Sequence, residues 1–218
     1  MEKLDIFRDI AERTGGDIYL GVVGPVRTGK STFIKRLMEL LMIKNIEDPY
    51  ERERTRDELP QSGAGKTIMT TEPKFIPKEA VGITVSEGLE IKMRVVDCVG
   101  YTVEGALGYI EDDGPRMVRT PWFDEEIPFQ EAAEIGTRKV ITDHSTIGLV
   151  VTTDGTITDI PRANYVPAEE RVIAELKELD KPFVVILNSV KPQSPEAQEL
   201  AEELREKYNV PVMAMDVA

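Results

Sequence analysis

Apolar runs along this chain alternate with segments whose apolar residues recur every three or four positions. The runs predict strands at residues 18–23, 89–97, 146–154, 182–189 and 210–217. The helical spacing predicts helices at residues 31–43, 167–179 and 196–208, the second with a proline at its start. Strands that are apolar throughout are typical of parallel sheets, which are covered on both faces. The pattern therefore predicts an α/β fold with a mostly parallel sheet flanked by helices.

Several segments depart from this alternation. Residues 1–16 predict an amphipathic N-terminal helix, and the highly charged residues 45–60 predict a solvated helix or loop. Residues 61–75 predict a Gly-rich loop that leads into an edge strand. Residues 101–145 are too long for a plain connection between two core strands, so they predict an insertion, with a helix near residues 130–142. We expect Trp122, in this insertion, to pack in the core; a contact surface between copies of the chain is the alternative.

Composition narrows the class of protein. The 218 residues carry a net charge of -13 at pH 7, which argues against binding to nucleic acid or to an anionic membrane surface. The single cysteine, Cys98, excludes an internal disulfide and fits a reducing cytosol. The single histidine, His144, excludes His-rich zinc sites. We therefore expect a cytoplasmic protein with no nucleic-acid partner.

Residues 24–31, GPVRTGKS, lie between a predicted strand and a predicted helix. A phosphate loop needs a glycine, four residues and then Gly-Lys-Ser/Thr in this setting, because backbone N–H groups and the helix N-terminus surround the anion. Lys30 would reach the β- and γ-phosphates, and Ser31 would bind magnesium. Residues 60–67, PQSGAGKT, lack the first glycine and predict a flexible loop. The nucleotide-binding residues that we expect here are Gly24, Pro25, Val26, Arg27, Thr28, Gly29, Lys30, Ser31 and Thr32.

Asp97 ends a predicted strand and begins an Asp-x-x-Gly sequence that closes at Gly100. This sequence is common by chance, but its place after a phosphate loop favours a role at the nucleotide. Asp97 would hold the magnesium shell through a water, and the N–H of Gly100 would meet the γ-phosphate. Thr70 and Thr71 lie between the two motifs, where a switch threonine binds magnesium and the γ-phosphate. Either threonine can fill that role, and a pair of strand threonines is the alternative.

Residues 188–191, NSVK, bear on base recognition. In regulatory GTPases the corresponding Asn-Lys-x-Asp ends in an aspartate that accepts hydrogen bonds from guanine. Lys191 has only donors and cannot replace it, whereas it can donate to N1 of adenine. Asn188 would brace the phosphate loop or reach N7 of the base. These residues favour ATP over GTP, unless the base is read elsewhere or hardly at all.

The position after Gly100, where Ras-type enzymes place a glutamine that orients water, holds Tyr101. Tyrosine cannot act as a base near neutral pH, so hydrolysis is slow or another group assists. Arg27, inside the phosphate loop, is the first candidate cation, with a solvent-facing or ion-paired side chain as the alternative. Lys66 is the second candidate. A GTP-binding switch and a nucleotide-binding structural module with negligible hydrolysis stay open as alternative functions.

The chain resembles the N-terminal nucleotide-binding domain of the stage IV sporulation protein A family. The matching stretches are spread along the chain: GPVRTGKSTFIKR, GKTIMTTEPKFIP, VDCVGY, TDHSTIGLVVTTDG and VILNS. The resemblance implies a P-loop fold of the translation-factor GTPase type that hydrolyses ATP, with Mg²⁺ as the metal. It matches Lys30 to the family's phosphate-loop lysine, Asp97 to its magnesium-site aspartate, and Thr70 with Thr71 to its sensor threonines.

The resemblance also implies a place of action. Hydrolysis would drive polymerisation into the basement layer of the spore coat, on the mother-cell face of the outer forespore membrane. A small amphipathic membrane protein would anchor the layer, and other coat proteins would join it. The family's protein is much longer than this chain, so residues 1–218 would be its ATPase domain without the later domains.

Overall fold

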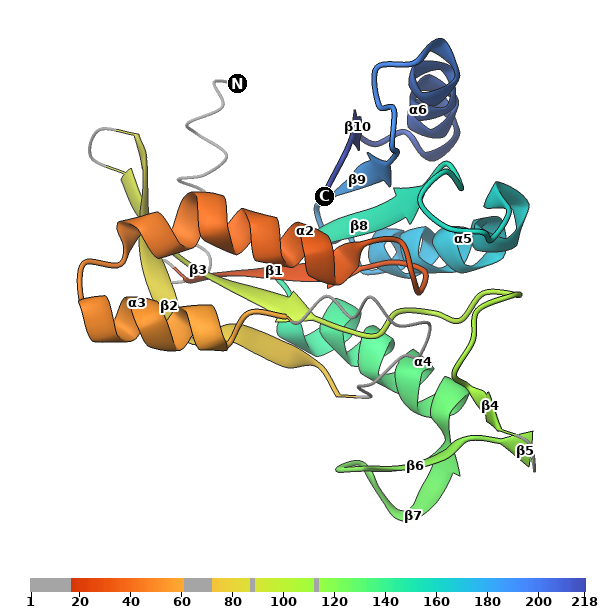
Figure 1. Ribbon diagram of the computed structural model, residues 1–218, viewed down its shortest axis with the longest axis horizontal. Coiled ribbons are helices and arrows are strands. Elements are labelled where there is room, and N and C mark those ends of the chain that lie inside the picture. Colours follow the sequence, from red (N-terminus) through yellow and green to blue (C-terminus); the bar gives the residue numbers. More distant parts are fainter. Residues whose placement is uncertain (1–16, 61–71, 87–88, 112–113) are drawn as a thin grey trace.

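The structure is a computed structural model that describes residues 17–60, 72–86, 89–111 and 114–218 (Figure 1). The helix expected within residues 1–16 lies outside the described residues, as does the loop of residues 61–71. Among the described residues, the main sheet has six strands in the order β10-β9-β8-β1-β3-β2. β2 is antiparallel to β3 and the other neighbours are parallel, which confirms the mostly parallel sheet. Its strands are β1 (Asp17–Val23), β2 (Lys74–Ser86), β3 (Leu89–Asp97), β8 (Ile147–Thr153), β9 (Phe183–Asn188) and β10 (Val212–Met215).

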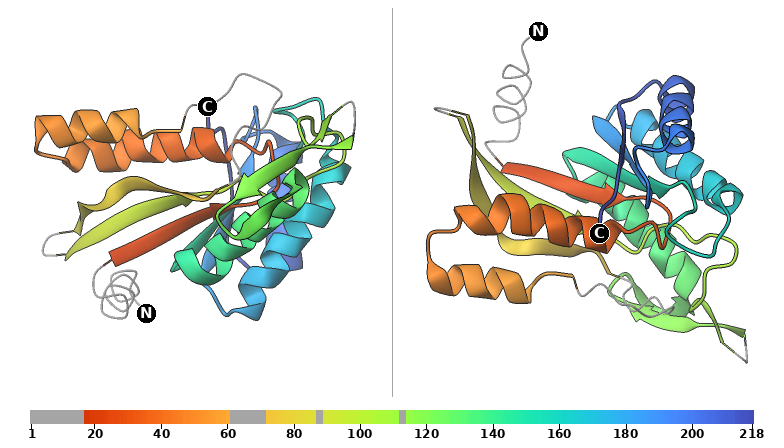
Figure 2. Two further views of the ribbon diagram at one scale, coloured as in Figure 1. Left: turned by 90° about the horizontal axis from the view of Figure 1, so that it is seen from below. Right: turned by 45° about the horizontal axis from the view of Figure 1, so that its top comes forward.

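Helices cover both faces of this sheet, as predicted. Figure 2 shows α2 (Lys30–Leu37) and α3 (Pro49–Asp57) on one side, with α4 (Phe129–Lys139) and α5 (Arg162–Glu178) on the other. The alternation along β1 divides the core: Ile18, Leu20 and Val22 pack with residues of α2, whereas Val23 packs with residues of α5 and α6 (Pro195–Tyr208). Within the described residues, every helix is too short or too polar to cross a membrane.

The helix predicted at residues 31–43 continues beyond α2 with a different hydrogen-bond pattern. A π-helical turn, Met38–Met42, follows α2, and a 3-10 turn, Ile43–Asn45, follows that. Leu40 and Leu41, which stand at helical spacing with Phe33 and Leu37, are 57% and 47% exposed. Ile34 in α2, followed by Met38 and Met42 at intervals of four residues, faces the core instead, so Leu40 and Leu41 lie on the opposite side.

The helix predicted at residues 167–179 begins one turn and a half earlier. α5 has Pro161 at its N-cap and includes Pro167 in its second turn. A proline at this point removes one hydrogen bond, which would otherwise reach the carbonyl of Ala163. Ala163 is exposed, so its carbonyl lies on the face of the helix turned to water, where the loss is small.

Residues 101–145 contain the expected helix, α4, and two small hairpins. One pairs β4 (Ile110–Glu111) with β5 (Gly114–Pro115), and the other pairs β6 (Met117–Thr120) with β7 (Phe123–Pro128). Figure 1 shows the β6–β7 hairpin projecting away from the main sheet. Trp122 lies at its turn, half-buried, with Nζ of Lys139 5.8 Å from the ring centre. The expectation of core packing for Trp122 was wrong, because this hairpin lies outside both core clusters.

β2 is an edge strand, as predicted, and its pairing with β3 breaks between Ile76 and Val81. Pro77, inside this break, has no N–H to offer. The N–H of Lys78 donates to a carboxylate oxygen of Glu58, 3.0 Å away. Lys78 and Glu79 are exposed. The outer edge of β2 is therefore charged and partly capped at its middle.

Candidate functional site

The loop between β1 and α2 has the backbone that a phosphate loop requires. Gly24 has φ of 138° and Gly29 has φ of 92°, both in the region that favours glycine. A Cβ on Gly24 would lie 2.3 Å from the carbonyl oxygen of Val151, so a side chain there would collide with β8. Arg27 also has a positive φ, 61°. The chain therefore curls tightly between the end of β1 and the start of α2.

Lys30, the first residue of α2, folds its side chain back over this loop. Its Nζ donates to the carbonyl oxygen of Pro25 at 2.6 Å, and the residue is 5% exposed. Burial lowers the pKa of Lys30, and the nearby Cys98 and Asp97 oppose that shift. The hydroxyl of Thr28 donates to the same carbonyl. A loop carbonyl therefore holds the ammonium group that was expected to reach the phosphates.

Asp97 lies at the end of β3, in register with Val22 of β1. The hydroxyl of Ser31 donates to its Oδ2 at 3.3 Å, whereas its Oδ1 is buried without a hydrogen-bond partner among the described residues. Burial raises the pKa of Asp97, and the charge of Lys30 opposes that shift. A buried oxygen without a partner is costly unless a cation or water joins it.

The donor set around Asp97 suits Mg²⁺. A carboxylate and a hydroxyl are hard oxygen ligands, and Mg²⁺ takes one or two such protein groups while keeping waters and phosphate oxygens. Among the described residues there is no cluster of three or more His, Cys, Asp or Glu side chains that would form a full protein cage. Ser31 and Asp97 therefore fit a magnesium ion that arrives with its nucleotide.

Gly100 lies against the phosphate loop. A Cβ on it would be 2.2 Å from the carbonyl oxygen of Gly24 and 2.6 Å from Nζ of Lys30. Its N–H, expected to meet a phosphate, donates instead to Oγ1 of Thr137 in α4 at 3.1 Å. Thr137 was missed by the sequence analysis, because a threonine inside an amphipathic helix carries no signal of such a contact.

Tyr101 joins three parts of the fold. Its N–H donates to the carbonyl of Gly24, and its own carbonyl accepts from the N–H of Val26 at 2.8 Å. Its phenol donates to Glu175 of α5 at 2.6 Å, and the Arg171 guanidinium lies 4.1 Å from the ring centre. Burial is the largest cause that raises the pKa of the Tyr101 phenol, and the hydrogen bond to Glu175 and its charge raise it further. The side chain is committed to α5 and does not take the place of a water-orienting glutamine.

Asn188 braces the phosphate loop. Its Nδ2 donates to the carbonyl oxygen of Thr28 at 3.0 Å, and its Oδ1 accepts from the N–H of Val217 at 3.3 Å. Lys191 is exposed in the loop after β9, where its N–H donates to the hydroxyl of Ser189. Asn188 and Lys191 thus belong to one loop, but only Asn188 contacts residues 24–31.

The other predicted site residues differ in burial, and three of them are not described by the structure. Pro25 and Val26 are buried in the loop, and Thr32 is half-buried in α2. Arg27 is half-buried, and its positive charge acts on the phenol of Tyr165 in α5. Thr70, Thr71 and Lys66 lie outside the described residues. The structure therefore brings together the phosphate loop, Asp97, Gly100 and Asn188.

Comparisons with known proteins agree with one another. The family description "Stage IV sporulation protein A, ATPase domain" matches residues 1–218. Proteins named stage IV sporulation protein A are 66% identical in Bacillus anthracis and 65% identical in Bacillus subtilis (strain 168), over 100% of this chain. The namesake in Clostridioides difficile (strain 630) is 60% identical over 98% of it.

The chain spans 44% of the length of the two Bacillus relatives and 43% of the Clostridioides one. Among solved structures, a crystal structure of an SsGBP mutation variant has a TM-score of 0.49 at 13% identity, covering 99% of this chain and 54% of that one. The match of the family description over the whole chain decides the assignment. This chain belongs to the stage IV sporulation protein A family and carries its ATPase domain.

Proposed function

We propose that this chain is a Mg²⁺-dependent ATPase. The observation that carries the proposal is the meeting of Lys30, Ser31 and Asp97 where β1 and β3 end, with one carboxylate oxygen of Asp97 buried and unpartnered among the described residues. When bound, Mg²⁺ would neutralise charge that develops on the phosphates. Ser31 and Asp97 would hold it, and Lys30 would leave the Pro25 carbonyl for the β- and γ-phosphates.

The fold type and domain organisation form part of this proposal. β3, which holds Asp97, lies beside the phosphate-loop strand, and the antiparallel β2 follows it at the edge. This arrangement supports a P-loop NTPase of the translation-factor GTPase type. Residues 1–218 would form one ATPase domain, with residues 101–145 as an insertion and residues 1–16 as an N-terminal helix. The remaining length of the relatives would hold the later domains.

Further residues have proposed roles at the same site. The backbone of residues 24–32 would surround the phosphates, and either Thr70 or Thr71 would sense the γ-phosphate through its hydroxyl on magnesium. Arg27 would add positive charge near the phosphates as a finger in cis. We invoke a cation because the phenol of Tyr101 is bound to Glu175. Arg27, inside the phosphate loop, is the first candidate and Lys66 the second.

Base choice rests on the loop after β9. Lys191, exposed and rich in donors, cannot accept hydrogen bonds from guanine, and we propose that it admits adenine. Asn188 is committed to Thr28 and Val217, which leaves the base to the neighbouring residues. ATP is therefore the proposed substrate, with a GTP-binding switch as the alternative.

At the level of the whole protein, we propose that hydrolysis drives self-assembly into the basement layer of the spore coat. The layer would lie on the mother-cell side of the outer forespore membrane, held by a small amphipathic membrane protein and joined by other coat proteins. The family assignment supports this role.

The deciding experiment is turnover of ATP and of GTP, offered separately with Mg²⁺, by the wild-type chain and by Lys30→Ala. We expect ATP hydrolysis that Lys30→Ala abolishes, and slower turnover in Arg27→Ala. Hydrolysis of GTP alone would refute the ATPase assignment and the role of Lys191. Tight ATP binding without turnover would favour a structural module, the alternative that the bound phenol of Tyr101 supports.

A further inference from the structure

Gly100 lies between the phosphate loop and α4. On one side it abuts the carbonyl of Gly24 and Nζ of Lys30, so tightly that a Cβ would lie 2.6 Å or less from either atom. On the other side its N–H reaches Oγ1 of Thr137 at 3.1 Å. The peptide that precedes Gly100 therefore separates the proposed phosphate site from a buried helix side chain.

The other hydrogen bond of Thr137 shows which group is the donor in its contact with Gly100. Its hydroxyl donates to the carbonyl of Ala133, one turn back in α4, at 2.8 Å. Oγ1 is therefore left as an acceptor, and the N–H of Gly100 is its donor. Thr137 is fully buried, so neither group can exchange this partner for bulk water. The N–H of Gly100 can leave Thr137 without penalty only if another buried acceptor replaces it.

We propose that Thr137 is a positioning residue that holds the N–H of Gly100 in the nucleotide-free state and yields it to the terminal phosphate of ATP. This inference rests on the proposed ATPase function. ADP lacks the γ-phosphate and leaves the bond to Thr137 intact. α4 thus loses its hydrogen bond to Gly100 when ATP binds and keeps it when ADP binds.

Release of the N–H from Thr137 begins with a local rotation of one peptide, and α4 then shifts because it has lost this contact. Gly100 has φ of 96°, and glycine turns between such conformations at low cost. Its neighbour Tyr101 is fixed by main-chain bonds to Gly24 and Val26 and by its phenol to Glu175. Tyr101 therefore stays in place while the peptide before Gly100 rotates.

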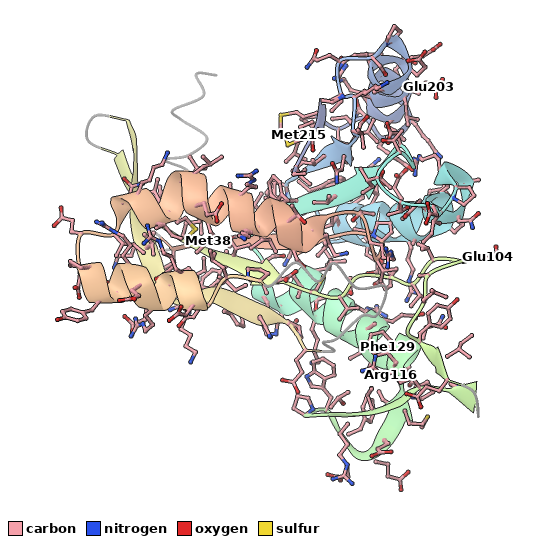
Figure 3. The ribbon with its side chains drawn as sticks, viewed as in Figure 1. Met38, Glu104, Arg116, Phe129, Glu203 and Met215 are labelled. Atoms are coloured by element: carbon pink, nitrogen blue, oxygen red, sulfur yellow. The ribbon has the colours of Figure 1, made fainter. Side chains whose placement is uncertain are left out.

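α4 is tied to the hairpins that precede it. The N–H of Phe129, its first residue, donates to the carbonyl of Arg116 at 2.7 Å, and the Arg116 guanidinium lies 5.0 Å from the Phe129 ring centre. Figure 3 labels this pair beside the β6–β7 hairpin. At the other end of α4, Lys139 lies over Trp122. A shift of α4 therefore changes the surroundings of Trp122, the chain's single tryptophan.

The test compares wild type, Thr137→Val and Thr137→Ser. Valine keeps the shape of threonine without the hydroxyl, whereas serine keeps the acceptor. Calorimetric titration with Mg²⁺ and either ADP or a non-hydrolysable ATP analogue gives the ratio of the two affinities. We expect Thr137→Val to shift this ratio about tenfold toward the analogue, because the N–H of Gly100 loses its nucleotide-free partner. We expect Thr137→Ser to match wild type.

A second measurement on the wild type does not depend on the folding of a variant. Trp122 emission is expected to change with the ATP analogue and to stay constant with ADP. An unchanged ratio in folded Thr137→Val, or a Trp122 response equal for both nucleotides, would overturn the role of Thr137. Failure of wild type to bind either nucleotide would instead refute the proposed function. Lys30→Ala serves as the control that defines the signal of a protein without nucleotide binding.

Discussion

Replacing Asn188 with alanine tests how the phosphate loop is held. The side chain is 3% exposed and makes two buried hydrogen bonds, to the carbonyl of Thr28 and from the N–H of Val217. Alanine leaves both backbone groups without partners. Each buried unpaired group costs about 1–3 kcal/mol. We expect Asn188→Ala to lower the free energy of unfolding by about 2–6 kcal/mol, a large share of the stability of a domain.

Urea unfolding measures this loss, and a matched variant calibrates it. Asn164, at the start of α5, makes one bond from an exposed site, to the carbonyl of Glu104 at 2.9 Å. We expect Asn164→Ala to lose less than about 1 kcal/mol. The isosteric Asn188→Asp keeps the acceptor for Val217 but places a carboxylate oxygen against the carbonyl of Thr28, so its nucleotide affinity falls most. Equal losses in Asn188→Ala and Asn164→Ala would refute the bracing role.

Three more perturbations test other parts of the structure. Gly29→Ala places a Cβ 2.5 Å from Nδ2 of Asn188 at a φ of 92°; we expect it to lower stability by about 1–3 kcal/mol and to abolish nucleotide binding, and normal ATP affinity by titration would contradict this. Burial raises the pKa of the Cys98 thiol from 9.0 to about 11, so the unfolded chain loses this proton first as pH rises. Between pH 9 and 11, wild type should therefore lose about 2 kcal/mol more unfolding free energy than Cys98→Ala. The same pH dependence of unfolding in both variants would contradict this. Glu169 is fully buried and accepts hydrogen bonds from Arg162, Tyr208 and Thr152, so Glu169→Ala should cost about 3–5 kcal/mol by urea unfolding. Its control is Glu170→Ala, which removes an exposed pair with Lys207 and should cost less than about 1 kcal/mol.

Much of the fold could be predicted from local patterns. The apolar runs marked the core strands because a strand covered on both faces tolerates few polar residues. Gly24, Gly29 and Lys30 were predictable because the loop imposes strict backbone demands on residues that are close in sequence. Asp97 could be placed at the same edge of the sheet because it ends a strand that runs parallel to β1.

Features that depend on tertiary packing could not be predicted in this way. The bond between Gly100 and Thr137 joins residues 37 positions apart, and neither position marks the other. Leu40 and Leu41 are exposed although their spacing is helical, because Ile34, Met38 and Met42 form the buried side of this helix. Core packing was expected for Trp122, whereas the projecting hairpin leaves it half-buried. Tertiary packing, which a local sequence pattern does not contain, decides each of these features.

The capped edge of β2 limits the ways in which copies of this chain can associate. An open, uncharged edge would recruit strands from neighbours, and the product would resemble amyloid, templated by any partly unfolded copy. Pro77, the bond from Lys78 to Glu58 and the exposed charges close that route along the middle of the strand. The ordered layers proposed for the whole protein would then not grow by strand addition along the middle of β2. Such a layer would grow only from correctly folded copies. The assembled layer would not bind amyloid dyes.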